Sequence, residues 1–155
     1  MGVAMRLVAV TRDNLDEVTA MDAGDGGMQV ASNQRSMAQA AVHDDAWPRA
    51  IEADGRLVGF VMLSDTSLRA HAAPPHAYYL WRFMIDRTQQ GRGLGSQALR
   101  LVIEHVKTRP GADALTLSYV PGQPASAGLE RLYGRHGFVP TGELDDGEVV
   151  MKLVF

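Results

Sequence analysis

The sequence contains no cysteine among its 155 residues. Disulfide scaffolds, thiolate zinc sites, iron–sulfur clusters and a cysteine nucleophile are therefore excluded. Basic residues are scattered and outnumbered, 15 against 18 acidic residues, which gives a net charge of −3. A general nucleic-acid surface needs clustered cations to neutralise phosphates, so we expect no nucleic-acid partner. Long apolar runs are also missing, so we expect no membrane association and a cytoplasmic location.

The remaining composition is typical of a globular domain. Hydrophobic residues make up 46% of the chain and charged residues 21%, which is close to average usage. A chain of this length buries roughly 70% of its unfolded surface, so we expect one domain over residues 1–155. The five histidines show neither HxxxH nor HExxH spacing, and no metal site is predicted.

Hydrophobic periodicity and turn residues predict the order of the elements. The dipeptides Asp54-Gly55 and Asp146-Gly147 favour tight hairpin turns. Crossover helices combined with such hairpins indicate an α/β fold in the loose sense, or α+β. The predicted elements are a strand at 6–10, a helix capped by Thr11, a helix at 33–43, strands at 49–53, 57–63 and 78–86, a helix at 96–107, a strand at 114–120, a helix at 127–136 and two strands within 138–155.

Three glycines, Gly91, Gly93 and Gly95, separate the buried strand at 78–86 from an amphipathic helix. Glycine lets the backbone approach a ligand closely, and the first N–H groups of a helix have no partner inside it. This combination predicts a cradle for an anion such as a pyrophosphate.

Several interpretations of this turn compete. A P-loop requires Gly-Lys-Ser/Thr at its end, whereas residues 95–97 read Gly-Ser-Gln. Residues 93–98 satisfy the GxGxxA dinucleotide fingerprint, but the next strand ends in Tyr119-Val120 where that motif needs an acid. A glycine turn without any ligand also stays open, because isolated GxG matches are common.

The segment 90–95, Gln-Gly-Arg-Gly-Leu-Gly, resembles the QxxGxG/A motif of the GCN5-related N-acetyltransferase (GNAT) superfamily. Residues 132–138, Leu-Tyr-Gly-Arg-His-Gly-Phe, resemble the family's LYxxxGF signature, and the strand ending at Asp86 is similar to its fourth strand. The agreement extends over residues 78–155, and the first half has the family's order of elements. Within the superfamily, the chain looks like the small bacterial spermine/spermidine (diamine) acetyltransferase-like group.

The resemblance implies a mixed, mostly antiparallel sheet of six to seven strands, flanked by about four helices and splayed between the fourth and fifth strands. Acetyl-CoA would lie in this splay as acetyl donor, without a metal, and a homodimer is implied. The backbone of the strand would pair with the pantetheine arm, while the glycine turn would hold the pyrophosphate. The cofactor-binding residues implied in this way are Phe83, Met84, Ile85, Gln90, Gly91, Arg92, Gly93, Leu94, Gly95 and Ser96.

The candidates for catalytic residues follow from the protons that the reaction must transfer. An amine resembling lysine has a pKa of about 10.4, so presenting it neutral at pH 7 costs about 4.6 kcal/mol. The family provides an oxyanion donor from a fourth-strand N–H, near Met84 here. Tyr133 matches the tyrosine of LYxxxGF and would protonate the leaving thiolate, although its apolar helix face also fits a core tyrosine.

The general base is not identified by the sequence. Many relatives place a carboxylate near the middle of the fourth strand, whereas this strand has none there. Simple alternation places Arg82 on one face with Leu80 and Met84, where it either pairs with a carboxylate or points into the acceptor site. Glu52 and Glu143 are candidates for a base acting through water, and neither is preferred.

The sequence thus predicts an acetyl-CoA-dependent N-acetyltransferase that moves an acetyl group directly to a primary amine of a small molecule, with a polyamine-like acceptor favoured. An aminoglycoside- or amino-acid-modifying acetyltransferase and a non-catalytic CoA-binding or sensing module remain as alternatives. Residues 22–34 and 65–77 are expected to shape the acceptor pocket.

Overall fold

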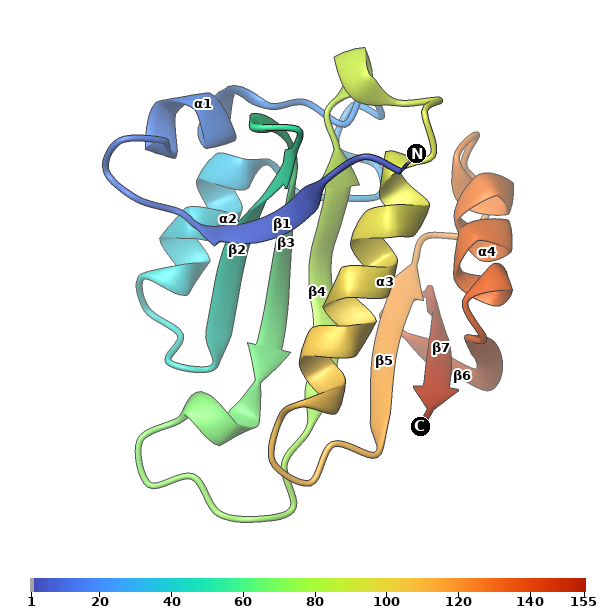
Figure 1. The fold of residues 1–155 in the computed structure, drawn as a ribbon. Helices are drawn as coiled ribbons and strands as arrows, with labels where there is room; N and C mark the ends of the chain where they lie inside the picture. The colour runs from blue at the N-terminus through green and yellow to red at the C-terminus, as the bar shows by residue number, and fades with distance from the viewer. Residues whose placement is uncertain (1) are drawn as a thin grey trace.

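The computed structural model describes residues 2–155 (Figure 1). Within them, seven strands form one sheet in the order β1-β2-β3-β4-β5-β7-β6. The strands are β1 Met5–Ala9, β2 Ala46–Ala53, β3 Arg56–Asp65, β4 Tyr78–Ile85, β5 Ala114–Tyr119, β6 Val139–Asp145 and β7 Glu148–Val154. The helices are α1 Leu15–Ala20, α2 Asn33–Ala40, α3 Leu94–Lys107 and α4 Ser126–Arg135, with 3-10 turns at Thr66–Leu68 and Arg87–Gln89. All neighbouring strands are antiparallel except β4 and β5, which confirms the expected fold class.

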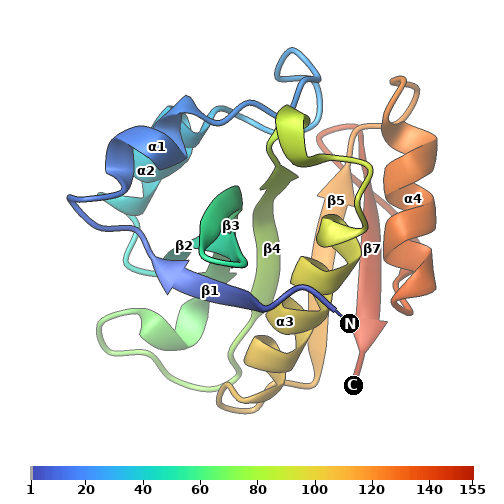
Figure 2. The same ribbon diagram turned by 45° about the horizontal axis from the view of Figure 1, so that its top comes forward.

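The helices form a layer on each face of the sheet, α1 and α2 on one and α3 and α4 on the other (Figure 2). Strand alternation divides the core accordingly, because successive side chains point to opposite faces. Val61 and Leu63 join the larger cluster beneath α3 and α4, whereas Phe60 and Met62 join the smaller one beneath α1 and α2. None of the helices in residues 2–155 is long and apolar enough to span a bilayer.

The two predicted hairpin turns are confirmed. Asp54 and Gly55 both have positive φ angles, 50° and 80°, as a type I′ turn requires. Asp146 and Gly147 show the same pattern at 49° and 81°. These turns fix the registers of the β2–β3 and β6–β7 pairs.

The predicted start of the first helix at Thr11 is wrong. The α1 helix begins at Leu15, with Asn14 as its N-cap. Asn14 accepts a hydrogen bond from the Thr11 N–H through its side-chain oxygen at 2.7 Å. The residues between β1 and α1 therefore close a separate turn before the helix begins.

A β-bulge interrupts β4 at Trp81. Met62 lies opposite Arg82 and Leu63 lies opposite Leu80, so Trp81 is an extra residue on β4. A bulge bends its strand and places neighbouring side chains on the same face. The alternation of β4 therefore shifts by one residue at this point.

The pairing of β4 with β5 is short. Only Tyr79 with Thr116 and Leu80 with Leu117 pair in parallel. From residue 81 to 85, the edge of β4 that faces β5 has no strand partner among the described residues. The two strands thus part at the bulge, where the resemblance placed the splay.

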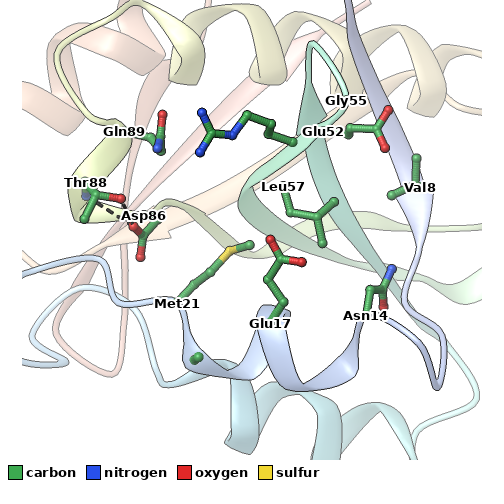
Figure 3. A pocket seen from close by; sticks show the side chains of 12 residues that line it. Val8, Asn14, Glu17, Met21, Glu52, Gly55, Leu57, Asp86, Thr88 and Gln89 are labelled. Atoms are coloured by element: carbon green, nitrogen blue, oxygen red, sulfur yellow. Dashed lines mark hydrogen bonds between the residues drawn. The ribbon is translucent and has the colours of Figure 1, made fainter.

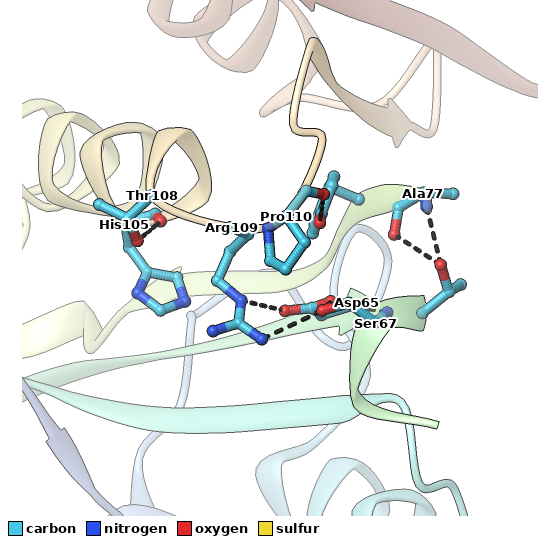
Figure 4. A network of polar contacts seen from close by, with 9 residues as sticks. Asp65, Ser67, Ala77, His105, Thr108, Arg109 and Pro110 are labelled. Carbon is cyan, nitrogen blue, oxygen red and sulfur yellow. Dashed lines mark hydrogen bonds and ion pairs between the residues drawn. The ribbon is translucent and has the colours of Figure 1, made fainter. Parts of the chain in front are cut away.

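At the end of the sheet away from the glycine turn, a polar network joins β3 to the loop that follows α3 (Figure 4). The Arg109 Nε donates to the Asp65 carboxylate at 2.8 Å, and its Nη2 donates to Ser67 Oγ at 3.0 Å. The Asp65 side chain is only 1% exposed, so Arg109 compensates a buried charge. This contact ties the end of β3 to the loop that follows α3.

Candidate active site

A cavity of about 370 Å³ lies where β4 and β5 part. Its wall is mostly apolar, which suits a flexible chain such as a pantetheine arm. Its lining comes from β4, α3, α4 and the loop before α2: Ala23, Asp25, Gln29, Val30, Leu80, Trp81, Phe83, Met84, Ile85, Gln90, Gly95, Ala125, Gly128, Leu129, Leu132 and Tyr133. The expected contribution of residues 22–34 is therefore present, whereas residues 65–77 do not line this cavity.

The three β4 residues that are predicted to bind the cofactor have their side chains in the core. Phe83 and Ile85 pack against the larger cluster, and Met84 belongs to the smaller one. The backbone N–H and C=O groups of Phe83 and Ile85 lie on the edge of β4 that β5 leaves unpaired, whereas those of Met84 face Phe60 on β3. An unpaired strand edge offers N–H and C=O groups to an extended ligand.

The glycine turn has the conformation that the motif predicts. Gly91 and Gly93 have φ angles of 81° and 74°, and a Cβ added at either would meet no atom within 4 Å. The helix α3 begins at Leu94, two residues before the predicted start, with Gly93 as its N-cap. Among the described residues, no backbone acceptor is recorded for the N–H groups from Gly91 to Ser96. These donors and the positive end of α3 form an open cradle for an anion.

Side-chain hydrogen bonds hold the turn against β4. Gln90 donates through its amide to the carbonyl oxygens of Ala23, at 2.8 Å, and Ile85, at 2.9 Å. Gln90 thus connects the end of β4 with the loop before α2, as its expected role in shaping the turn requires. Arg92 is exposed and donates to Gln89 Oε1 at 2.5 Å.

Two contacts at this cleft had no signal in the sequence. The amide of Gln29 pairs twice with the backbone of Val120, donating at 2.8 Å and accepting at 2.9 Å. It therefore fastens the loop before α2 to the end of β5. Ser96 at the start of α3 makes a 2.8 Å hydrogen bond with His136 Nε2. Both contacts join segments far apart in the chain, which periodicity and motifs do not reveal.

Tyr133 lines the cavity and is 5% exposed. Its ring makes an edge contact with Phe138 at a centroid distance of 5.9 Å. Burial raises the pKa of Tyr133, and the nearby Tyr79 raises it further, so the phenol keeps its proton at neutral pH. The Tyr133 hydroxyl therefore faces the cleft in its protonated form, which a proton donor requires.

The face assigned to Arg82 by simple alternation is corrected by the bulge. Leu80 belongs to the cluster beneath α3, whereas Arg82 reaches α2 and donates to Gln39 Oε1 at 2.9 Å. Arg82 shares its face with Met84 but not with Leu80. No carboxylate of the described residues lies within ion-pair distance of Arg82, so the expected alternative of an ion pair is wrong. Burial, and secondly the charge of Arg35, lowers its pKa.

The two carboxylates considered as bases lie away from the cleft. Glu52 accepts from Arg6 Nη2 at 2.6 Å and lines a separate cavity of about 610 Å³ beside α1 (Figure 3). Glu143 is exposed on β6. Neither residue lines the cavity between β4 and β5.

Comparison with known families identifies the class of protein that this fold and cleft represent. The model of the Acetyltransferase (GNAT) family matches residues 24–138, which include the splay, the glycine turn and the LYxxxGF segment. The chain therefore belongs to the GNAT acetyltransferase family.

Curated relatives are similar over part of the chain. It is 35% identical over 99 residues to the spermine/spermidine N(1)-acetyltransferase of Bacillus subtilis, and the match covers 63% of each protein. It is 32% identical over 78 residues to the L-2,4-diaminobutyric acid acetyltransferase of Nocardia farcinica, covering 50% of this chain and 37% of that one. The matches thus span less than two thirds of these relatives.

Solved structures share the fold over nearly the whole chain. The aminoglycoside acetyltransferase AAC(6')-Ib in complex with coenzyme A superposes with a TM-score of 0.74, covering 99% of this chain and 95% of that one at 16% identity. The PaiA N-acetyltransferase of Thermoplasma acidophilum, also with coenzyme A, gives 0.66 over 100% of both chains at 16% identity. At such identities the likeness establishes the fold alone.

Proposed function

We propose that the protein is an acetyl-CoA-dependent N-acetyltransferase that acts on a primary amine of a small molecule. One observation supports this most strongly: an unpaired β4 edge, an apolar cavity and an anion cradle are arranged along one cleft. They match the extended pantetheine arm and the pyrophosphate of CoA in chemistry and order.

The residues that hold the donor follow from this arrangement. Within the segment Phe83, Met84 and Ile85, the backbone groups of Phe83 and Ile85 on the free edge pair with the pantetheine arm. The N–H groups from Gly91 to Ser96 hold the pyrophosphate. Arg92, exposed beside the turn, adds a cation for the phosphates. Acetyl-CoA supplies the activated acetyl group.

Transfer is direct, without an acetylated enzyme. The β4 N–H near Met84 donates to the thioester oxygen as negative charge develops on it. The amine nitrogen forms the new bond to carbon, the carbon–sulfur bond breaks, and Tyr133 gives its proton to the sulfur. The amine, charged in water, must lose a proton before it attacks.

A polyamine-like acceptor is favoured over the alternatives. The curated relatives are named for spermine, spermidine and diaminobutyric acid, which all carry more than one amino group. The net charge of −3 is compatible with a cationic acceptor. The aminoglycoside enzyme shares only the fold, at 16% identity, so its substrate is weaker evidence for the acceptor of this chain.

Thiol release from acetyl-CoA tests this proposal. It is measured with polyamines, diamino acids, aminoglycosides and peptide N-termini as acceptors, beside calorimetric titration with CoA. We expect saturable release with amines that carry a second amino group. Tight CoA binding without release from any acceptor would favour the non-catalytic sensing module, and absence of CoA binding would refute the proposal.

A further inference from the structure

A chain of hydrogen bonds crosses the sheet where β4 and β5 part. The Tyr79 hydroxyl lies 2.6 Å from Ser118 Oγ, and Ser118 Oγ donates to Glu148 Oε1 at 3.1 Å. Ser118 is the first β5 residue beyond Leu117, where pairing with β4 ends. The chain therefore leads from β4, across the point of the splay, to the start of β7.

The hydrogen bonds in this chain all run in one direction, from Tyr79 toward Glu148. An ionised carboxylate only accepts hydrogen bonds, so Ser118 uses its single hydrogen toward Glu148. Tyr79 must then donate to Ser118. The Tyr79 oxygen keeps lone pairs that can accept a proton, and each hydrogen bond beyond it points toward Glu148. The arrangement can move a proton from Tyr79 to the carboxylate without reorienting any group first.

The chain lies on the face of the sheet away from Tyr133. Leu80 packs beneath α3, so its neighbour Tyr79 points to the α2 face, whereas Tyr133 belongs to α4. The cavity between β4 and β5 is nonetheless lined by Leu80 and Trp81, the two residues that directly follow Tyr79 on β4. Burial raises the pKa of Tyr79, and the charged groups near its hydroxyl are Glu148 on β7, Asp145 on β6 and Arg82 on β4.

We propose that Glu148 receives the proton of the acceptor amine through Ser118 and Tyr79, which supplies the base that β4 lacks. The inference rests on the proposed function. One N–H bond of the ammonium breaks and its proton passes to Tyr79 as the Tyr79 proton moves to Ser118 and the Ser118 proton to Glu148. The nitrogen lone pair then attacks the thioester carbon. The thiolate takes the Tyr133 proton, and the second proton lost by nitrogen restores Tyr133.

The Glu148→Gln variant tests the relay with two nucleophiles. The amide that replaces the carboxylate still accepts from Ser118, so the fold and the hydrogen bond are retained, but the amide cannot take a proton. At pH 7 and saturating acetyl-CoA, kcat/KM for the alkyl amine acceptor should fall on the order of 10²-fold. With hydroxylamine, which is largely neutral at this pH and needs no base, the rate should fall less than about threefold. Tyr79→Phe should reproduce this selectivity.

Glu143→Gln is the matched control, because Glu143 is an exposed carboxylate on the neighbouring strand β6. It should leave both rates unchanged. Equal losses with both nucleophiles in Glu148→Gln would indicate a structural role and overturn the relay, as would full activity with the alkyl amine. A wild-type protein that acetylates neither nucleophile would instead refute the proposed function, and the relay with it.

Discussion

The Tyr133→Phe variant removes a single hydroxyl from the cleft. This hydroxyl has no hydrogen-bond partner among the described residues, so its loss leaves no partner unsatisfied, and stability should change by less than about 1 kcal/mol. Tyr133 is also the single hydroxyl among the described residues that line the cavity. The one carboxyl there, on Asp25, accepts from the N–H groups of Gly27 and Gln29 and does not replace a phenol as proton donor.

The expected loss is that of a general acid. Such a group contributes on the order of 10² to 10⁴ in rate, so kcat should fall at least about 10²-fold, or about 2.7 kcal/mol in activation free energy. Thiol release at saturating acetyl-CoA and amine measures kcat, and CoA titration and thermal unfolding control for binding and folding. Full turnover at saturating acetyl-CoA, with both controls unchanged, would refute the acid role.

Three further predictions follow from the structure. Gly93→Ala, at a φ of 74°, should lower the free energy of unfolding by about 1 kcal/mol and weaken CoA binding. Gly111→Ala, at a φ of 61° and outside the cleft, should lower the free energy of unfolding as much without affecting CoA binding. Denaturant unfolding measures the stability of each variant, and calorimetric titration measures its CoA binding. Arg109→Ala leaves the buried Asp65 unpaired and should destabilise by about 3 kcal/mol, lowering Tm by roughly 6–12 °C without lowering activity in the cold. Because burial raises the pKa of Tyr133, this acid stays protonated as pH rises, and kcat should show no loss from it below about pH 10.

Local patterns were sufficient for most of the fold. Turn dipeptides such as Asp54-Gly55 gave the hairpins because positive φ angles restrict the residue type. The same restriction applies to Gly91 and Gly93, so the sequence alone predicts the position of the cradle. The periodicity of α3 gave its buried face, since Leu99 and Val102 are fully buried.

The features that the sequence could not predict depend on contacts between segments far apart in the chain. The bulge at Trp81 depends on the register between β3 and β4, and it moved Arg82 away from the face of Leu80. The pairing of Gln29 with Val120 depends on two segments meeting at the cleft. The relay to Glu148 likewise requires three strands to lie side by side, and its residues follow no motif along the chain.

The central claim is that acetyl-CoA lies between β4 and β5 with its pyrophosphate on the glycine turn. Hydrogen–deuterium exchange with and without CoA tests it most directly, because it reports on backbone N–H groups. We predict that CoA slows exchange at residues 81–85 and at residues 91–96, while the exposed strand β6 is unaffected. Protection confined to other segments, such as those around the separate cavity beside Glu52, or no protection at all, would contradict the account.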